Sequence, residues 1–281
     1  MRLVKTLAAV SVLLSALSCQ KADNDDRPLL LVSIEPQRKV LESLAGNAFR
    51  VETMLPGTSN PETYEPSAAE RMEVDKAEIY FSTGVLPFEK ELEKSSSTEF
   101  VDTSRDIDFL YGTHAHNGHM HNVADPHYWS SVAGMRKVAA NMAEALMHMY
   151  PDSIDVFKAR MDLYNAHLDS LDKSLASTLA GVPARAFAVW HPSLSYFAND
   201  YGLKQITVGE DGKEMSARTM AARIDSARAN NVRVLFFQQE FDSRQGTVVN
   251  DGIGSRMIIV NPLAYDWEGQ LEYIADELAK P

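Results

Sequence analysis

Five of the eight histidines in this 281-residue chain lie between residues 114 and 127. Neutral imidazole is a common ligand for zinc and neighbouring transition metals, so this clustering indicates a protein that handles such an ion. Four of the five form a run without apolar periodicity: His114, His116, His119 and His121. The run predicts a mobile, solvated loop that samples metal weakly, and the alternative is a linker without function.

The fifth histidine, His127, follows Asp125-Pro126 and precedes a stretch with apolar residues at helical spacing. Because proline fits the first turn of a helix, His127 is expected at a helix start, where a ligand is held firmly. Asp125 is then either the N-cap of that helix or a partner that orients the imidazole.

The elements that position these residues follow from the pattern of the rest of the chain. From Pro28 onward, short β-rich runs alternate with helical patterns, which predicts mostly parallel sheets with helices on both faces. Apolar residues recur in steps of three and four from Ile154 to Leu179, which predicts a helix of about 28 residues, roughly 42 Å long. Such a rod braces two domains, and a coiled-coil dimer seam is the alternative. The predicted fold is α/β, with two (β/α)4 domains joined by one long spine helix.

The N-terminus indicates export. Residues 1–18 have a basic start, an apolar centre and small residues before Cys19, which is typical of a secretory signal too short to span a membrane permanently. Ala16-Leu17-Ser18-Cys19 resembles a bacterial lipobox, so Cys19 is expected to carry a lipid anchor in the periplasm or at the cell surface; a structural cysteine is the alternative. It is the only cysteine, which excludes an intramolecular disulfide.

The expected division of the chain has five parts. They are a signal peptide (1–18), a flexible tether (19–27), an N-terminal α/β domain (28–150), a linking helix (151–183) and a C-terminal α/β domain (184–281). The formal charge of −12 argues against nucleic acid as a partner and suits a protein that binds cations, although solubility alone also explains it.

Further candidate ligands come just after predicted strands, where open α/β sheets bind their ligands. They are Glu62, His191, Glu240 and Asn261. With His127, two residues from each half can meet in one cleft as a His₂Glu₂ metal set. Structural roles remain open for each: His191 as a helix cap, Glu62 as the partner of an arginine, and Glu240 as a strand-end residue.

From about Pro28 to the C-terminus the chain resembles the zinc and manganese substrate-binding lipoproteins of ABC importers, the ZnuA/TroA-like cluster. The motifs that carry the resemblance are Asp125-Pro-His127-Tyr-Trp129, His191-Pro-Ser-Leu-Ser-Tyr196-Phe197 and Tyr201-Gly-Leu203. The resemblance implies that His127 and His191 are metal ligands, that the histidine run is typical of zinc-specific members, and that the long helix is the family's spine.

Two positions depart from the family pattern. Glu62 stands where the family usually has histidine, which keeps a ligand but adds a negative charge and a harder donor, so Mn²⁺ or Fe²⁺ is an alternative to Zn²⁺. Asn261 stands where an aspartate is frequent, and an amide is a poor zinc ligand. The fourth ligand is therefore Glu240, Asn261 or water.

The function expected from these features is capture of Zn²⁺ in an interdomain cleft and its delivery to an ABC permease driven by a cytoplasmic ATPase, by a monomer that is not an enzyme. A metal-dependent adhesin of the same fold is an alternative. A zinc hydrolase with Glu62 or Glu240 as general base is another, although the chain has no His-Glu-x-x-His or Gly-x-Ser-x-Gly motif.

Overall fold

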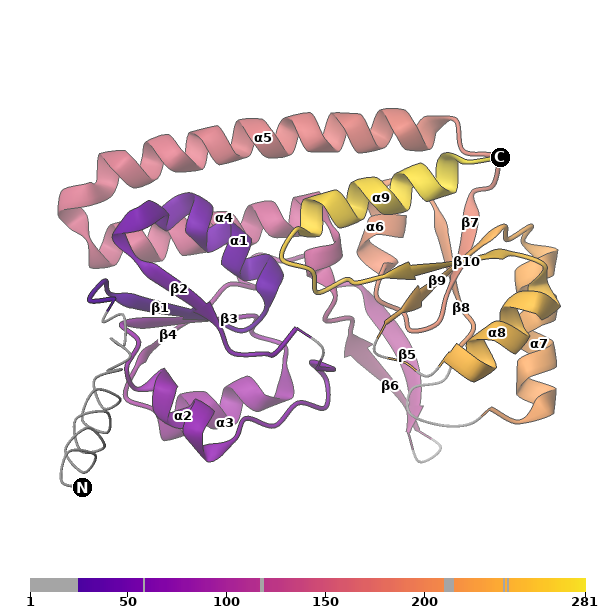
Figure 1. Ribbon diagram of the computed structural model, residues 1–281, viewed down its shortest axis with the longest axis horizontal. Helices are drawn as coiled ribbons and strands as arrows, with labels where there is room; N and C mark the ends of the chain where they lie inside the picture. The colour runs from indigo at the N-terminus through magenta and orange to yellow at the C-terminus, as the bar shows by residue number, and fades with distance from the viewer. Residues whose placement is uncertain (1–24, 58, 117–118, 210–214, 240, 242) are drawn as a thin grey trace, which may run out of the picture.

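The computed structural model describes residues 25–57, 59–116, 119–209, 215–239, 241 and 243–281. Within them the chain forms two four-stranded, all-parallel sheets, and the long helix α5 (Ile154–Ala180) runs along both of them (Figure 1). The predicted α/β fold is confirmed.

The first sheet has the strand order β2-β1-β3-β4. Its central strands are continuous apolar runs and are fully buried, because helices α1 and α4 cover one face and α2 and α3 the other (Figure 1). The elements of this half are β1 (Leu29–Val32), α1 (Glu35–Ala45), β2 (Arg50–Thr53), α2 (Ala68–Val74), β3 (Ile79–Ser82), α3 (Pro87–Ser95), β4 (Glu99–Asp102) and α4 (Val132–Met149).

The second sheet has the order β10-β9-β7-β8, so that β7 and β9 are central and buried. Its elements are β7 (Ala186–Val189), α6 (Ser195–Asp200), β8 (Lys204–Thr207), α7 (Ala217–Ala229), β9 (Val234–Gln238), α8 (Ser243–Ile253), β10 (Arg256–Val260) and α9 (Trp267–Ala279). The predicted alternation of strands and helices therefore holds in both halves.

Helix α5 has 27 residues, which at 1.5 Å per residue is about 40 Å. Its apolar stripe is buried: Phe157, Tyr164, Leu168, Leu171, Leu175 and Leu179. It packs against α1 and α4 of the first half and α9 of the second, so the stripe is filled within this chain and is not a free coiled-coil seam. Gly46, with a φ of +63°, leaves room for the Arg160 guanidinium to bind the last carbonyls of α1.

The histidine run forms a hairpin, and the predicted loop is wrong. Strands β5 (Tyr111–His116) and β6 (His119–Ala124) pair antiparallel, with His114 opposite His121 and His116 opposite His119. Residues 117 and 118, between the two strands in sequence, lie outside the described residues. Among the described residues, no helix has the length and apolar character needed to cross a membrane.

Parallel strands place their carboxyl ends at one edge of each sheet, and the candidate residues follow such ends. The turn with Glu62 comes after β2, and His191 comes two residues after β7. Gln238 is the last residue of β9, beside β7 in the sheet. Side chains from distant parts of the sequence are thereby brought to one place between the two sheets.

Candidate metal centre

His127 is held by its neighbour Asp125. One carboxylate oxygen, Oδ1, accepts a hydrogen bond from the His127 main-chain N at 2.9 Å and contacts the ring Nδ1 at 2.8 Å. An ionised carboxylate only accepts hydrogen bonds, so Nδ1 carries the ring proton. In the neutral ring the lone pair is then on Nε2, which is the tautomer that binds a metal through Nε2.

His127 stands at the start of a 3₁₀ helix, as its N-cap, and not at the start of the long helix predicted from the apolar pattern. A short 3₁₀ turn (Tyr128–Ser130) follows it, and α4 begins only at Val132. Ser131 is the N-cap of α4, because its side chain accepts from Gly134 N at 3.0 Å. Asp125 takes the second role predicted for it, the orientation of the imidazole.

The charge of Asp125 is stabilised by this contact. Burial raises the pKa of Asp125, but the hydrogen bonds from the ring and the main chain of His127 outweigh burial and hold the pKa below its ordinary value. The carboxylate is therefore ionised at neutral pH. An ionised acceptor on Nδ1 makes the imidazole a stronger metal donor at Nε2.

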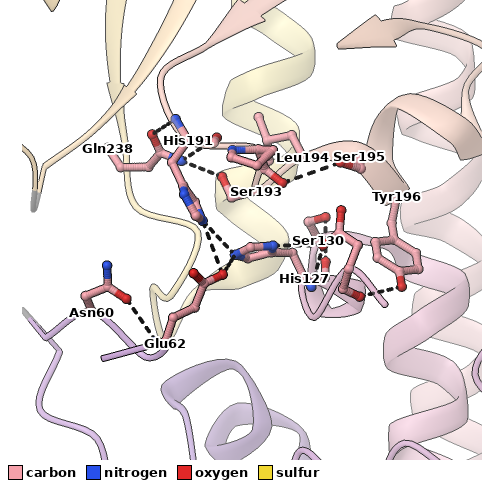
Figure 2. Close-up of polar contacts among 12 residues, drawn as sticks. Asn60, Glu62, His127, Ser130, His191, Ser193, Leu194, Ser195, Tyr196 and Gln238 are labelled. Atoms are coloured by element: carbon pink, nitrogen blue, oxygen red, sulfur yellow. Dashed lines mark hydrogen bonds and ion pairs between the residues drawn. The ribbon is translucent and has the colours of Figure 1, made fainter. Parts of the chain in front are cut away.

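His191 is held through its main chain by Gln238. The side-chain Nε2 of Gln238 donates to the carbonyl of His191 at 2.9 Å and to Ser193 Oγ at 2.6 Å, and its Oε1 accepts from His191 N at 3.3 Å (Figure 2). The His191 ring stacks on Phe241 with 5.7 Å between ring centroids. Both histidines are buried, with relative exposures of 4% for His127 and 6% for His191.

Glu62 reaches the two imidazoles from the turn after β2 (Figure 2). Its main-chain N donates to Asn60 Oδ1 at 2.9 Å, and its side chain is 37% exposed. Glu62 Oε1 lies 3.7 Å from His127 Nε2 and 3.6 Å from His191 Nε2. The two Nε2 atoms are 3.1 Å apart.

These separations match a shared ion. Zinc binds imidazole nitrogen and carboxylate oxygen at about 2.0–2.2 Å, so two tetrahedral ligand atoms of one ion lie about 3.3 Å apart. The three donor atoms of Glu62, His127 and His191 all lie within 4.8 Å of one another. They come from both halves of the chain, as expected from their places after the strands.

The other candidate residues from the sequence are not among the three that meet at this site. Glu240 and Cys19 lie outside the described residues. Asn261 shapes the turn after β10, since its Oδ1 accepts from Leu263 N at 3.0 Å. For His114, His116, His119 and His121 the structure gives the strand register and not the side chains.

Sequence reasoning missed Gln238, which stands two residues before Glu240. Its only signal was a polar side chain ending an otherwise apolar strand, Val234 to Phe237. A polar side chain that is 1% exposed needs hydrogen-bond partners, and the main chain of His191 supplies them.

Comparison with known proteins places the chain in a family. The profile described as "Zinc-uptake complex component A periplasmic" matches residues 30–280. A crystal structure of ZnuA has a TM-score of 0.82 and 32% sequence identity, covering 90% of this chain and 98% of that one.

Two curated relatives agree. The zinc-binding lipoprotein AdcA of Streptococcus pneumoniae (strain ATCC BAA-255 / R6) is 25% identical over an alignment 280 positions long, which covers 94% of this chain and 56% of AdcA. The chain thus spans just over half the length of that relative. The zinc uptake protein ZnuA of Bacillus subtilis (strain 168) is 25% identical over an alignment 253 positions long, which covers 85% of this chain and 79% of that protein. The resemblance stated from the motifs is confirmed, and the chain belongs to the family of periplasmic zinc-uptake component A proteins.

Proposed function

We propose that this chain captures Zn²⁺ between its two sheets, with Glu62, His127 and His191 as ligands, and delivers it to an ABC importer. The observation that carries the proposal is the spacing of the three donor atoms, 3.1 to 3.7 Å, which fits ligands of one ion. Both imidazoles are buried, and their Nε2 atoms face each other and the Glu62 carboxylate.

The fourth ligand is Glu240 or a water molecule. Asn261 is not proposed, because its Oδ1 is engaged by Leu263 N. A water ligand is also what a zinc hydrolase needs. Membership of a family described as part of an uptake complex favours binding and release over hydrolysis.

A carboxylate as third ligand widens the choice of metal. Two histidines and one carboxylate suit Zn²⁺ and also Fe²⁺ or Mn²⁺, because carboxylate is a harder donor than imidazole. Zinc is the preferred ion here, since the two buried donors that are held in place are both nitrogens. Protons compete with the metal for both imidazoles, so zinc affinity falls in acid.

The proposed setting is the outer face of a membrane. Cys19 carries the lipid, residues 19–27 form the tether, and the domains at 28–150 and 184–281 flank the linking helix at 151–183. The partners are the metal ion, the permease and its cytoplasmic ATPase. The zinc uptake names of the relatives support this assignment.

The zinc-binding part of this proposal is tested by competitive titration of the metal-stripped protein with Zn²⁺ and Mn²⁺, alongside His127→Ala and His191→Ala. His167→Ala is the matched control, because this histidine lies on α5 with its side chain 54% exposed. We expect one tight site that is lost in both ligand variants and kept in the control. Tight binding that survives both substitutions means that the site is elsewhere.

The delivery of zinc to an importer is tested in cells. A strain without this gene is grown under zinc limitation and complemented with the wild type or with His127→Ala. Rescue by the wild type alone supports delivery, whereas equal rescue by both means that zinc capture at this site is not what the cells need.

A further inference from the structure

Tyr196 joins the two ends of the β5–β6 hairpin. Its hydroxyl donates to the carbonyl of Asp125 at 2.7 Å and accepts from Leu110 N at 3.1 Å. Leu110 immediately precedes β5, and Asp125 immediately follows β6. One buried hydroxyl of helix α6, from the second half of the chain, therefore bridges the neck of a hairpin that belongs to the first.

The neck itself is closed by the main chain. Asp125 N donates to the carbonyl of Leu110 at 2.8 Å, next to the first strand pair, Tyr111 with Ala124. Burial raises the pKa of Tyr196 to about 12, so the phenol keeps its proton at neutral pH and can donate and accept at once. The Tyr196 ring is 5% exposed, so packing fixes the place of this hydroxyl.

Asp125 is also the residue that orients His127. Its N is bound at the neck, its carbonyl is bound by Tyr196, and its carboxylate holds the His127 main chain and ring. All three polar groups of one residue are thus engaged. A displacement of the neck therefore moves the acceptor that fixes the tautomer and direction of the His127 ring.

Starting from the metal site proposed above, we propose that Tyr196 is a positioning residue: it fixes the hairpin neck and, through Asp125, the imidazole of His127.

The test is Tyr196→Phe in the purified, metal-stripped protein, since this change deletes only the hydroxyl. We expect zinc affinity to fall about tenfold, at the lower end of what loss of a ligand-orienting contact costs. We also expect faster hydrogen exchange at the Leu110 and Asp125 amides and a changed ¹⁵N shift of His127 Nδ1. Tyr164→Phe is the matched control, because its buried hydroxyl binds Glu268, between α5 and α9; it should leave zinc affinity and the His127 shift unchanged.

A double-mutant cycle with Asp125→Ala decides whether Tyr196 acts through Asp125. We expect Tyr196→Phe to have little further effect on zinc affinity once the carboxylate is gone. An undiminished tenfold loss in the Asp125→Ala background overturns the proposal, and so does wild-type zinc affinity in Tyr196→Phe. If the wild type itself binds no zinc through His127 and His191, the proposed function fails instead, so the two failures are distinguishable.

Discussion

The two histidines and the glutamate of the site are held in different ways. His127 has a carboxylate on its ring, and His191 has a buried glutamine on its main chain, whereas the Glu62 turn is supported by the side chain of Asn60. The histidines are 4% and 6% exposed, and the Glu62 side chain is 37% exposed. One site therefore combines two fixed donors with one that solvent reaches.

The difference teaches which donor does what. Fixed imidazoles lose little freedom when an ion binds, so their donor strength goes directly into affinity. Ordering a glutamate side chain costs about 1.5–2 kcal/mol, which offsets part of what the Glu62 carboxylate gains on the metal. The histidines should therefore set how tightly zinc is held, and Glu62 should tune which ion is preferred and how it leaves.

The largest effect is expected from removing the support of a fixed donor. Asp125→Ala deletes the acceptor on His127 Nδ1, so the ring loses its orientation and the lone pair is no longer confined to Nε2. Zinc affinity should fall by about 10- to 100-fold, measured by competition with a chromophoric chelator.

The control for this variant is Asp169→Ala. Asp169 is an exposed carboxylate on α5 that pairs with Arg136, so its removal changes the net charge equally without touching the site. Zinc affinity should stay at the wild-type value. An equal loss of zinc affinity in both variants would mean that the Asp125 effect comes from overall charge. The proposed difference between the fixed histidines and Glu62 would then have no support.

The sequence predicted most of the elements because their signals are local. An unbroken apolar run marked β1, and a three-and-four repeat marked α5. The hairpin was missed, because a run of alternating histidines has no apolar face that would mark a strand. Main-chain hydrogen bonds pair its two strands, and a residue of α6 binds Leu110 at its base from 86 residues away in sequence.

At the site, residue types were predictable and their supports were not. Strand ends pointed to Glu62 and His191, which lie beside His127. That Gln238 clamps His191 depends on β9 lying beside β7, a neighbourhood that no local pattern encodes. For Asp125 the two roles of helix cap and ring partner are equally compatible with its spacing, and only the packed structure chooses between them.

A smaller effect on zinc affinity is expected from changes at Glu62, the donor that solvent reaches. Glu62→Gln keeps the shape but removes the charge, and we expect zinc affinity to fall about tenfold and Mn²⁺ affinity to fall further, since Mn²⁺ depends more on carboxylate oxygen. Glu62→His should raise the ratio of Zn²⁺ to Mn²⁺ affinity. Both are measured by competitive titration with the two metals.

Glu65→Gln is the control for the Glu62 variants, because Glu65 is exposed on the same stretch of chain. It should leave both affinities unchanged. If the ratio of Zn²⁺ to Mn²⁺ affinity is the same in the wild type, Glu62→Gln and Glu62→His, then Glu62 does not tune metal choice, whatever its effect on affinity.

The smallest effect on zinc is expected from a buried carboxylate one layer behind the fixed donors. Glu89, on α3, accepts hydrogen bonds from Thr83 N at 2.6 Å and Leu86 N at 3.2 Å, and the Thr83 carbonyl accepts from the hydroxyl of Tyr128. Burial raises the pKa of Glu89, and the hydrogen bonds that it accepts from Ser33, Thr83 and Leu86 offset only part of the rise. Because Asp125 holds His127 directly, Glu89→Gln should change zinc affinity by no more than about threefold, below the range for ring-orienting contacts.

Its signature is instead a pH dependence of stability. A folded pKa above the unfolded one means that the folded state holds the proton more tightly, so this contribution to stability is complete below the unfolded pKa and is lost as the pH rises through the folded pKa. Glutamine cannot ionise, so the free energy of unfolding of the wild type should fall relative to that of Glu89→Gln as the pH rises from about 4.5, the ordinary value for glutamate. Urea denaturation of the metal-free proteins at several pH values measures this, with the exposed Glu93→Gln of the same helix as control. If the unfolding free energies of wild type and Glu89→Gln change in parallel with pH, Glu89 ionises equally in the folded and unfolded states. If Glu89→Gln instead causes a large loss of zinc affinity, residues of the core beyond Asp125 also hold His127 in place.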